Sequence, residues 1–295
     1  MKTSVIGCDV VQTSSLPAEC SVLPNVEDCE SGERWPALPP ARITYIIDHL
    51  HNIGAGGEQA LLRIIRHLPR DKFQPSVVTF KVKPRTAEIL QELECPLHVF
   101  PVQRTYDWDG LKAAFRIRKL LAAERSPNIV HTFFETSNTW GGLIAKLSFG
   151  PLLVSSRRDM GVLRATKHRL AYKLMNILSD RVLTVSKELS RVCIEEEGIR
   201  AEKVTTIHNG VDLAWADRAD DSSSVRASLG LPESSPLIVT VANIRRLKGL
   251  DVFIKAAALV RPKFKSAVFV IAGWPNEPQY FAELQQLVVN LGLQD

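Results

Sequence analysis

The chain has 295 residues, of which 45% are hydrophobic and 23% charged, a composition typical of a globular protein rather than a disordered one. Its net charge of +5 favours phosphorylated ligands or an anionic membrane surface, and is too small to indicate a nucleic-acid partner. No window approaches the roughly 18 consecutive apolar residues of a membrane-spanning helix. The five cysteines lack C-x-x-C spacing, which is typical of reduced thiols in a cytosolic protein and argues against a metal site.

Residues 1–40 show no hydrophobic period and contain five prolines. Residues 5–8 resemble a lipoprotein cleavage box, but the apolar run ahead of them is too short for a signal peptide. We therefore expect a disordered leader or a misassigned start codon.

From residue 42 onward, strand-like and helix-like segments alternate. Apolar runs predict seven strands, at 43–48, 77–80, 97–102, 129–134, 152–155, 181–185 and 204–207. Apolar residues at helical spacing, as in Leu61, Ile64, Ile65 and Leu68, predict helices between them, including 86–93, 111–123, 140–147, 167–178 and 187–196. Because buried parallel strands read as continuous apolar runs, we expect a doubly wound α/β domain over residues 41–212.

A polar stretch at 217–224 interrupts this alternation and indicates a linker, which we place at 213–235. A second α/β unit then begins, with strands at 237–241 and 268–272 and helices at 252–260 and 278–291. Only 35 residues (295 − 260) follow Val260, fewer than a nucleotide-binding α/β unit needs to close its sheet. We expect residues 236–295 to form the opening part of a second domain.

A basic loop joins the first strand of this second unit to its first helix. It carries Arg245, Arg246 and Lys248, and Gly249 opens the helix. Backbone N–H groups at a helix N-terminus and nearby cationic side chains both stabilise an anion, so the loop suits a diphosphate.

A glycine-rich segment, with Gly54, Gly56 and Gly57, follows the first predicted strand. Glycines at this place allow the backbone to approach a ligand closely, although a plain strand-to-helix turn would also explain them. Their spacing differs from the G-x-G-x-x-G fingerprint, and no acidic residue is well placed for a ribose, so a dinucleotide-dependent enzyme is the weaker interpretation.

Polar residues also accompany the fourth and fifth predicted strands. His131 lies where open parallel sheets bind ligands, and is either functional or a buried, hydrogen-bonded histidine. Arg157 and Arg158 suit recognition of phosphate or carboxylate. With Lys167 on the following amphipathic helix, they belong either to a surface that faces an acceptor or an anionic membrane, or to a solvated charged face.

Seven segments, taken in order, resemble the retaining glycosyltransferases of family 4, which have the GT-B fold. They are GGE at 56–58, NIVH at 128–131, SDRVLTVS at 179–186, IHNGVD at 207–212, VAN at 241–243, KGLD at 248–251 and VIAG at 270–273. The resemblance covers about residues 42–295, and its specificity lies in the ordered set rather than in any one segment.

The resemblance implies two Rossmann-like domains, the N-terminal one binding an acceptor and the C-terminal one a nucleotide sugar. It implies transfer of a hexose with retention of the anomeric configuration, without a metal or other cofactor. Gly56 and Gly57 would lie beside the donor's phosphates, and Lys248 would neutralise the leaving diphosphate. The role of Lys248 is chemically consistent, because cleaving a sugar–diphosphate bond builds negative charge on the diphosphate, which a fixed cation stabilises.

Three features depart from the family's pattern. Asn243 stands where the family often has arginine, so Arg245 or Arg246 would supply the second cation. Phe133 stands where many members have the second histidine of His-x-His, which leaves His131 as the candidate catalytic histidine. The acidic pair that grips the donor's ribose and sugar would lie beyond Asp295.

We therefore expect a glycosyltransferase of GT-B-like fold that acts on a lipid-linked or polysaccharide acceptor in polysaccharide biosynthesis. It would be cytoplasmic and peripheral at the inner face of the plasma membrane. Without the acidic pair, the 295-residue chain alone is expected to be inactive. The alternative is a non-catalytic short form that binds an acceptor or a partner subunit.

Overall fold

The computed structural model describes residues 39–51, 56–123, 129–148, 150–159, 166–210, 226–227, 230–232 and 234–294. The chain divides into two compact units, Met1–Gly210 and Val211–Asp295. The expected leader lies outside the described residues except for its last two positions, as does most of the expected linker. None of the described helices is long and apolar enough to cross a membrane.

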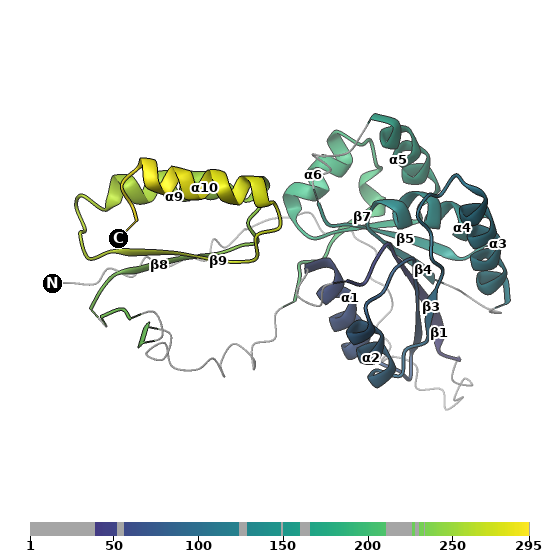
Figure 1. Cartoon of the computed structure of the whole chain (residues 1–295). Helices are drawn as coiled ribbons and strands as arrows, with labels where there is room; N and C mark the ends of the chain where they lie inside the picture. Colours follow the sequence, from purple (N-terminus) through teal and green to yellow (C-terminus); the bar gives the residue numbers. More distant parts are fainter. Residues whose placement is uncertain are drawn as a thin grey trace, which may run out of the picture. The chain divides into compact units, whose positions relative to one another are not determined.

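The N-terminal unit is built on a seven-stranded sheet in which every pairing is parallel (Figure 1). The strand order is β3-β2-β1-β4-β5-β6-β7, so the direction of winding reverses between β1 and β4. Such a reversal opens a crevice at the carboxyl ends of the strands. The strands are β1 (Ala41–Ile47), β2 (Phe73–Thr79), β3 (Leu97–Val99), β4 (Ile129–Phe133), β5 (Leu152–Arg157), β6 (Arg181–Thr184) and β7 (Val204–Thr206).

Helices cover both faces of this sheet, which confirms the expected doubly wound fold (Figure 1). On one face, α1 (Gly56–His67) and α2 (Pro84–Glu92) pack over a core that includes Tyr45 and Ile47. On the other, α3 (Trp108–Ala123), α4 (Gly142–Lys146) and α5 (Thr166–Leu178) pack over a core that includes Ile46. Neighbouring strand residues are thus buried on opposite faces, which is why the strands read as continuous apolar runs.

The last βαβ crossover uses α6 (Lys187–Glu195), which packs on β6 and β7 through a smaller core of Val182, Leu189, Cys193 and Ile199. Ser186 caps this helix by accepting a hydrogen bond from the backbone N–H of Leu189 at 3.1 Å. A short 3-10 turn, η2 (Ala201–Lys203), then leads into β7.

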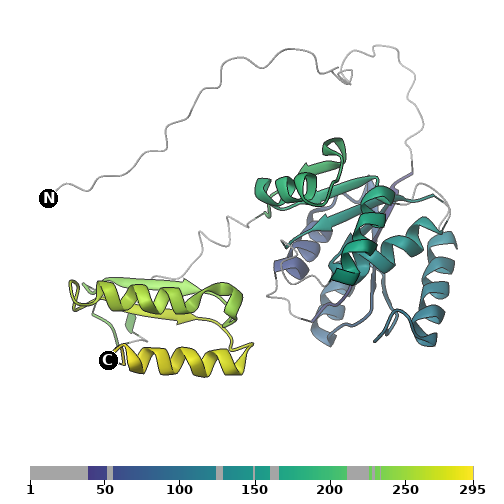
Figure 2. The same ribbon diagram turned by 90° about the horizontal axis from the view of Figure 1, so that it is seen from above.

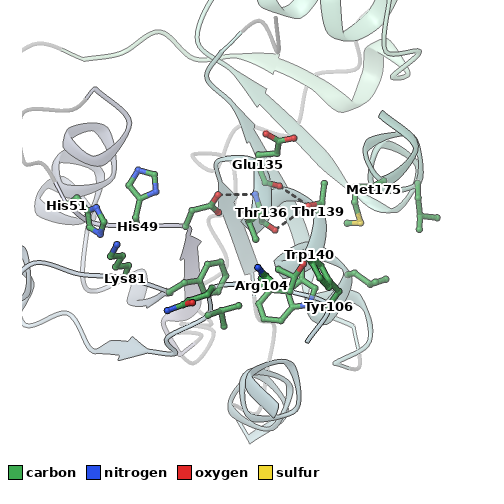
Figure 3. Close-up of a pocket in the computed structure, with 18 residues that line it drawn as sticks. His49, His51, Lys81, Arg104, Tyr106, Glu135, Thr136, Thr139, Trp140 and Met175 are labelled. Atoms are coloured by element: carbon green, nitrogen blue, oxygen red, sulfur yellow. Dashed lines mark hydrogen bonds between the residues drawn. The ribbon is translucent and has the colours of Figure 1, made fainter. Parts of the chain in front are cut away.

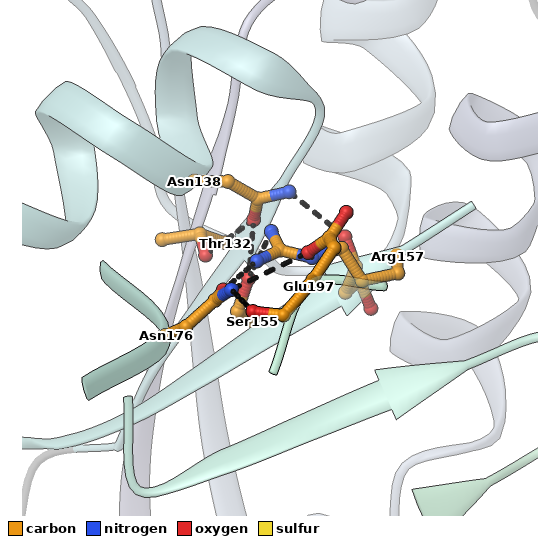
Figure 4. A network of polar contacts seen from close by, with 7 residues as sticks. Thr132, Asn138, Ser155, Arg157, Asn176 and Glu197 are labelled. Atoms are coloured by element: carbon orange, nitrogen blue, oxygen red, sulfur yellow. Dashed lines mark hydrogen bonds and ion pairs between the residues drawn. The ribbon is translucent and has the colours of Figure 1, made fainter. Parts of the chain in front are cut away.

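Arg157, expected on a surface facing an acceptor or a membrane, is instead the last residue of β5 and is only 2% exposed. Its guanidinium donates to Ser155 Oγ at 3.1 Å and to Asn176 Oδ1 at 2.6 Å (Figure 4). It also faces the Glu197 carboxylate at 3.6 Å and lies 4.3 Å from the centre of the Tyr172 ring. A buried guanidinium needs such partners, so Arg157 joins α5 and the end of α6 to the sheet.

This network explains which face of α5 is buried. Tyr172 and Asn176 turn inward to Arg157, whereas Leu170, Leu174 and Ile177 are exposed. Leu170 is 75% exposed and Ile177 is 73% exposed. The side chain of Lys167, at the start of this helix, lies outside the described residues.

The C-terminal unit contains two parallel strands, β8 (Leu237–Val241) and β9 (Val268–Ala272). Its two helices, α9 (Leu250–Val260) and α10 (Pro278–Asn290), lie side by side on one face of these strands (Figures 1 and 2). A separate core holds them, made of Ile244, Leu250, Ile254, Tyr280 and Leu284. The strands and helices predicted for this part of the chain are therefore present, with α9 starting two residues earlier than expected.

Replacing Arg157 with Met should destabilise the N-terminal unit by roughly 3 kcal/mol, because it leaves the partly buried Glu197 and the buried Asn176 without the guanidinium. Urea unfolding followed by circular dichroism measures this change. Arg191→Met is the matched control, since this exposed arginine pairs with Glu188 and Glu195 at the surface and should cost under about 1 kcal/mol. Equal losses in the two variants would contradict a structural role for Arg157.

Candidate functional site

Two pockets open where the strands of the N-terminal unit end. The first, the His131 pocket, has a volume of about 540 Å³ and lies between α1, the ends of β4 to β6 and the segment after β7. It brings together Gly56, His131 and Arg158, three residues singled out in the sequence. The other polar residues of its lining are Gln59, Arg63, His67, Ser156, Thr184, His208 and Asn209.

His131 is both buried and part of this pocket, so the two interpretations left open by the sequence are compatible. Its Nε2 lies 2.8 Å from Ser156 Oγ, and its ring packs against those of Tyr45 and Phe133 at centroid distances of 5.4 and 4.6 Å. Burial, and secondarily the charge of Arg158, lower the pKa of His131 to about 3. The imidazole is therefore neutral near pH 7, with one nitrogen a donor and the other an acceptor.

Arg158 supplies a cation beside this neutral imidazole. Its guanidinium carbon lies 4.8 Å from the centre of the Phe133 ring, and Nη1 donates to Asn209 Oδ1 at 2.9 Å. On the opposite wall, Arg63 Nη1 donates to the carbonyl oxygen of Gly210 at 2.7 Å. These two bonds connect β5 and α1 to the Asn-Gly segment after β7, which explains why that segment borders the pocket.

The two predicted glycines have different surroundings at the start of α1. A Cβ on Gly57 would lie 2.5 Å from the Phe134 ring, whereas one on Gly56 would meet nothing within 4 Å. Phe134 has φ of +70°, a left-handed conformation that is unusual for a bulky residue and marks local strain. Gly57 thus makes room for Phe134, while Gly56 faces the pocket. Gly54 lies outside the described residues.

The sequence assigned no role to the side chains that surround Phe134, although Glu58 belongs to the GGE segment at 56–58. The His49 ring stacks on the Phe134 ring, with centroids 5.2 Å apart and planes 11° apart. His49 Nε2 also lies 3.7 Å from the carboxylate of Glu58, which is buried in the first turn of α1. A histidine, a carboxylate and a strained aromatic ring therefore meet where the winding reverses between β1 and β4.

The second pocket, the Lys81 pocket, is larger at about 790 Å³, and the sequence did not predict it (Figure 3). His49, His51 and Lys81 lie on one side of it, and Tyr106, Glu135, Thr136 and Trp140 lie on the other. Lys81 and Arg104 are exposed cations, and neither has an ion pair with any residue that the structure describes. The pocket thus combines cationic, aromatic and carboxylate groups.

One wall of the Lys81 pocket is a π-helical segment, η1 (Ser137–Gly141), which precedes α4. Asp48, at the end of β1, accepts hydrogen bonds from the backbone N–H groups of Thr136 at 3.0 Å and Ser137 at 2.6 Å. Desolvation nevertheless raises the pKa of this half-buried carboxyl. π-Helical segments are frequent at functional sites, and Asp48 holds this one beside the end of β1.

The basic loop of the C-terminal unit differs in part from expectation. Arg246 donates two hydrogen bonds of 2.7 Å to the Glu283 carboxylate, and Arg245 lies 3.4 Å from that of Glu277. These two side chains therefore already have carboxylate partners. Lys248 is exposed, and among the described residues it has no ion pair. Gly249 takes φ of +61° between this loop and α9, a conformation that glycine adopts without strain.

The neutral state of His131 predicts acid sensitivity. Below pH 6.5 the unfolded chain binds a proton at His131, whereas the folded protein does not. The free energy of unfolding therefore falls as pH decreases from about 6.5 toward about 3. Between pH 7 and pH 5 the wild type should lose roughly 2 kcal/mol more than His131→Gln, whose amide does not titrate. Urea unfolding at the two pH values measures the difference, and equal losses would contradict a neutral His131.

Family models match both parts of the chain. The model described as Glycosyltransferase Family 4 matches residues 54–215, and the one described as Glycosyl transferases group 1 matches residues 221–295. The chain is 30% identical over 150 residues to D-inositol 3-phosphate glycosyltransferase 1 of Catenulispora acidiphila, a match that covers 47% of this chain and 35% of that relative. The corresponding Streptomyces scabiei enzyme is 29% identical over 126 residues, covering 40% of this chain and 28% of its own length. The chain thus spans about a third of these relatives.

Solved structures share the fold at low sequence identity. Anabaena HepE in complex with UDP and glucose has a TM-score of 0.67 at 20% identity, covering 85% of this chain and 67% of that one. A glycosyltransferase from Rickettsia africae has a TM-score of 0.68 at 16% identity, covering 87% and 66%. The first family model alone spans more than half of the chain. The chain therefore belongs to glycosyltransferase family 4.

Proposed function

We propose that this protein transfers a hexose from a nucleotide sugar to an acceptor with retention at the anomeric carbon, and without a metal or other cofactor. Family membership supports the reaction class, and structures with UDP or UDP-glucose bound are among the neighbours of the same fold. The observation that carries the proposal is the pair of pockets at the carboxyl ends of the parallel strands. Open α/β sheets bind their ligands at this edge.

The donor side of the proposal rests on the His131 pocket and on Lys248. Because Gly56 has no side chain, a ligand in the pocket can approach the backbone at the start of α1. Arg158 lines the same pocket. A neutral His131 can exchange hydrogen bonds with a sugar hydroxyl without placing a positive charge beside a developing oxocarbenium ion. Lys248, which has no described ion pair, would stabilise the negative charge that builds on the leaving diphosphate. Arg245 and Arg246 would first have to leave their carboxylates.

The acceptor side of the proposal rests on the Lys81 pocket. Relatives of this chain are named for an inositol phosphate, and Lys81 and Arg104 offer two cations without described ion pairs for such a phosphate. Glu135 can accept a hydrogen bond from a hydroxyl, and Trp140 can pack on the face of a ring. We therefore assign a phosphorylated polyol, free or lipid-linked, as the acceptor class. An uncharged polysaccharide would leave both cations without a partner.

Titration with inositol 3-phosphate and with inositol tests the acceptor. The phosphorylated compound should bind at least tenfold more tightly, because only it satisfies Lys81 and Arg104, and charge-assisted hydrogen bonds contribute roughly 1.5–3 kcal/mol each. Lys81→Ala should weaken its binding roughly tenfold or more, as measured by calorimetry.

Lys83→Ala is the matched control, since this exposed lysine lies two residues further along, outside the pocket. It should bind like the wild type. Preference for inositol, or equal loss in the two lysine variants, would contradict a phosphate subsite at Lys81.

In a protein that also carries the acidic pair of the donor site, Lys248→Ala should lower the transfer rate by roughly 10²–10³, by analogy with removing one group that stabilises transition-state charge. The rate is measured with radiolabelled UDP-glucose and GDP-mannose at saturating acceptor. Lys265→Ala, an exposed lysine elsewhere in the same unit, should leave the rate unchanged. Turnover of Lys248→Ala within a few-fold of wild type would exclude the diphosphate role.

A further inference from the structure

Helix α3 exposes a row of large apolar side chains to solvent. Trp108 is 70% exposed, Leu111 is 54% exposed and Phe115 is 67% exposed. At about 100° per residue these three positions fall within a sector of about 60°, on the side of the helix away from buried Ala113 and Ile117. A helix that packs on a sheet normally presents polar residues there, so this second apolar stripe is unexplained by the fold.

Cations flank the stripe on both sides. On the helical wheel, Lys112 and Lys119 fall on one side of it, and Arg118 falls on the other. Lys112 reaches the Trp108 ring, with Nζ 5.9 Å from the ring centre. The acidic residues near this surface, Asp107 and Asp109, are confined to the beginning of the helix, where Asp107 accepts a hydrogen bond from the Gly110 N–H at 2.7 Å.

The apolar surface continues onto the two neighbouring helices. α3 packs beside α4, and α4 beside α5, on the same face of the sheet. Leu143 of α4 is 37% exposed, Leu147 directly after this helix is 59% exposed, and Leu174 of α5 is 49% exposed. Leu143 and Leu174 also line the Lys81 pocket. The Lys81 pocket therefore borders the surface formed by the exposed apolar residues of α3, α4 and α5.

We propose that this surface, with α3 at its centre, docks on an anionic membrane and presents a lipid-linked acceptor to the Lys81 pocket. Large apolar side chains flanked by lysine and arginine are typical of helices that lie in the interface of a bilayer containing anionic lipid. The charge pattern selects this occupant, since cations on both sides of the stripe match a negatively charged surface. The phosphorylated acceptor rests on the function proposed above, and a membrane-docking surface beside the pocket selects its lipid-linked form over the free one.

Flotation with vesicles tests the docking and needs neither donor nor acceptor. The wild type should float with phosphatidylcholine vesicles that contain phosphatidylglycerol, and much less with phosphatidylcholine alone. The triple variant Trp108→Ser, Leu111→Ser, Phe115→Ser should lower the partition roughly tenfold or more, and so should the double variant Lys112→Glu, Lys119→Glu. Brominated lipid should quench the wild type more than Trp108→Phe.

Two controls separate this surface from general effects. Leu259→Ser removes a leucine that is 77% exposed on α9, and Lys187→Glu reverses an exposed charge at the start of α6. Both should float like the wild type, and circular dichroism should show that every variant is folded.

Equal flotation of wild type and triple variant, or no flotation at all, would overturn the proposal. So would a dimer in sedimentation velocity that the triple variant abolishes, because the surface would then join protein copies. The inositol 3-phosphate titration is independent of these outcomes. Docking can fail while the phosphate subsite stands, and the reverse also holds.

Discussion

The arrangement of the site depends on one constraint, that all seven strands of the N-terminal unit run parallel. Every strand then delivers its carboxyl end to the same edge, and the reversal between β1 and β4 leaves that edge open in the middle. The segments after β1 and β4 meet there, because Asp48 accepts hydrogen bonds from Thr136 and Ser137 and the His49 ring stacks on that of Phe134. The π-helical segment held by Asp48 and the α1 turn filled by Phe134 are both consequences of that meeting.

The buried charge of Arg157 sets the character of the outer surface as well as the interior. Because Tyr172 and Asn176 face the guanidinium, α5 leaves Leu170 and Leu174 exposed. Replacing such a network with apolar packing is often neutral or stabilising in proteins, so stability alone does not explain it. The network also fixes the orientation of α5. It turns Leu174 toward solvent beside the Lys81 pocket, in line with the exposed residues of α3 and α4.

Much of this fold follows from sequence because local pattern and burial agree. Strands such as β1 and β4 are apolar at consecutive positions since both faces are covered, and turn residues bound them. The interior role of Arg157 was not predictable, because its partners Asn176 and Glu197 are distant in sequence. The sequence did not predict the Lys81 pocket for the same reason, because its residues come from five separate segments of the chain. By contrast, Gly56, His131 and Arg158 were found because each lies at or near the carboxyl end of a strand.

The two pockets differ in their electrostatics in a way that suits two substrates. Burial keeps His131 neutral, so the imidazole offers hydrogen-bonding capacity without a charge of its own, and Arg158 is a cation beside it. The cations Lys81 and Arg104 are instead exposed, where water screens their attraction for an anion but little free energy is needed to keep them charged. Because water screens these contacts, a phosphorylated acceptor benefits from being concentrated near the pocket. A membrane surface beside the pocket would provide that concentration, and for this reason the apolar stripe on α3 and the cations of the Lys81 pocket form one functional proposal.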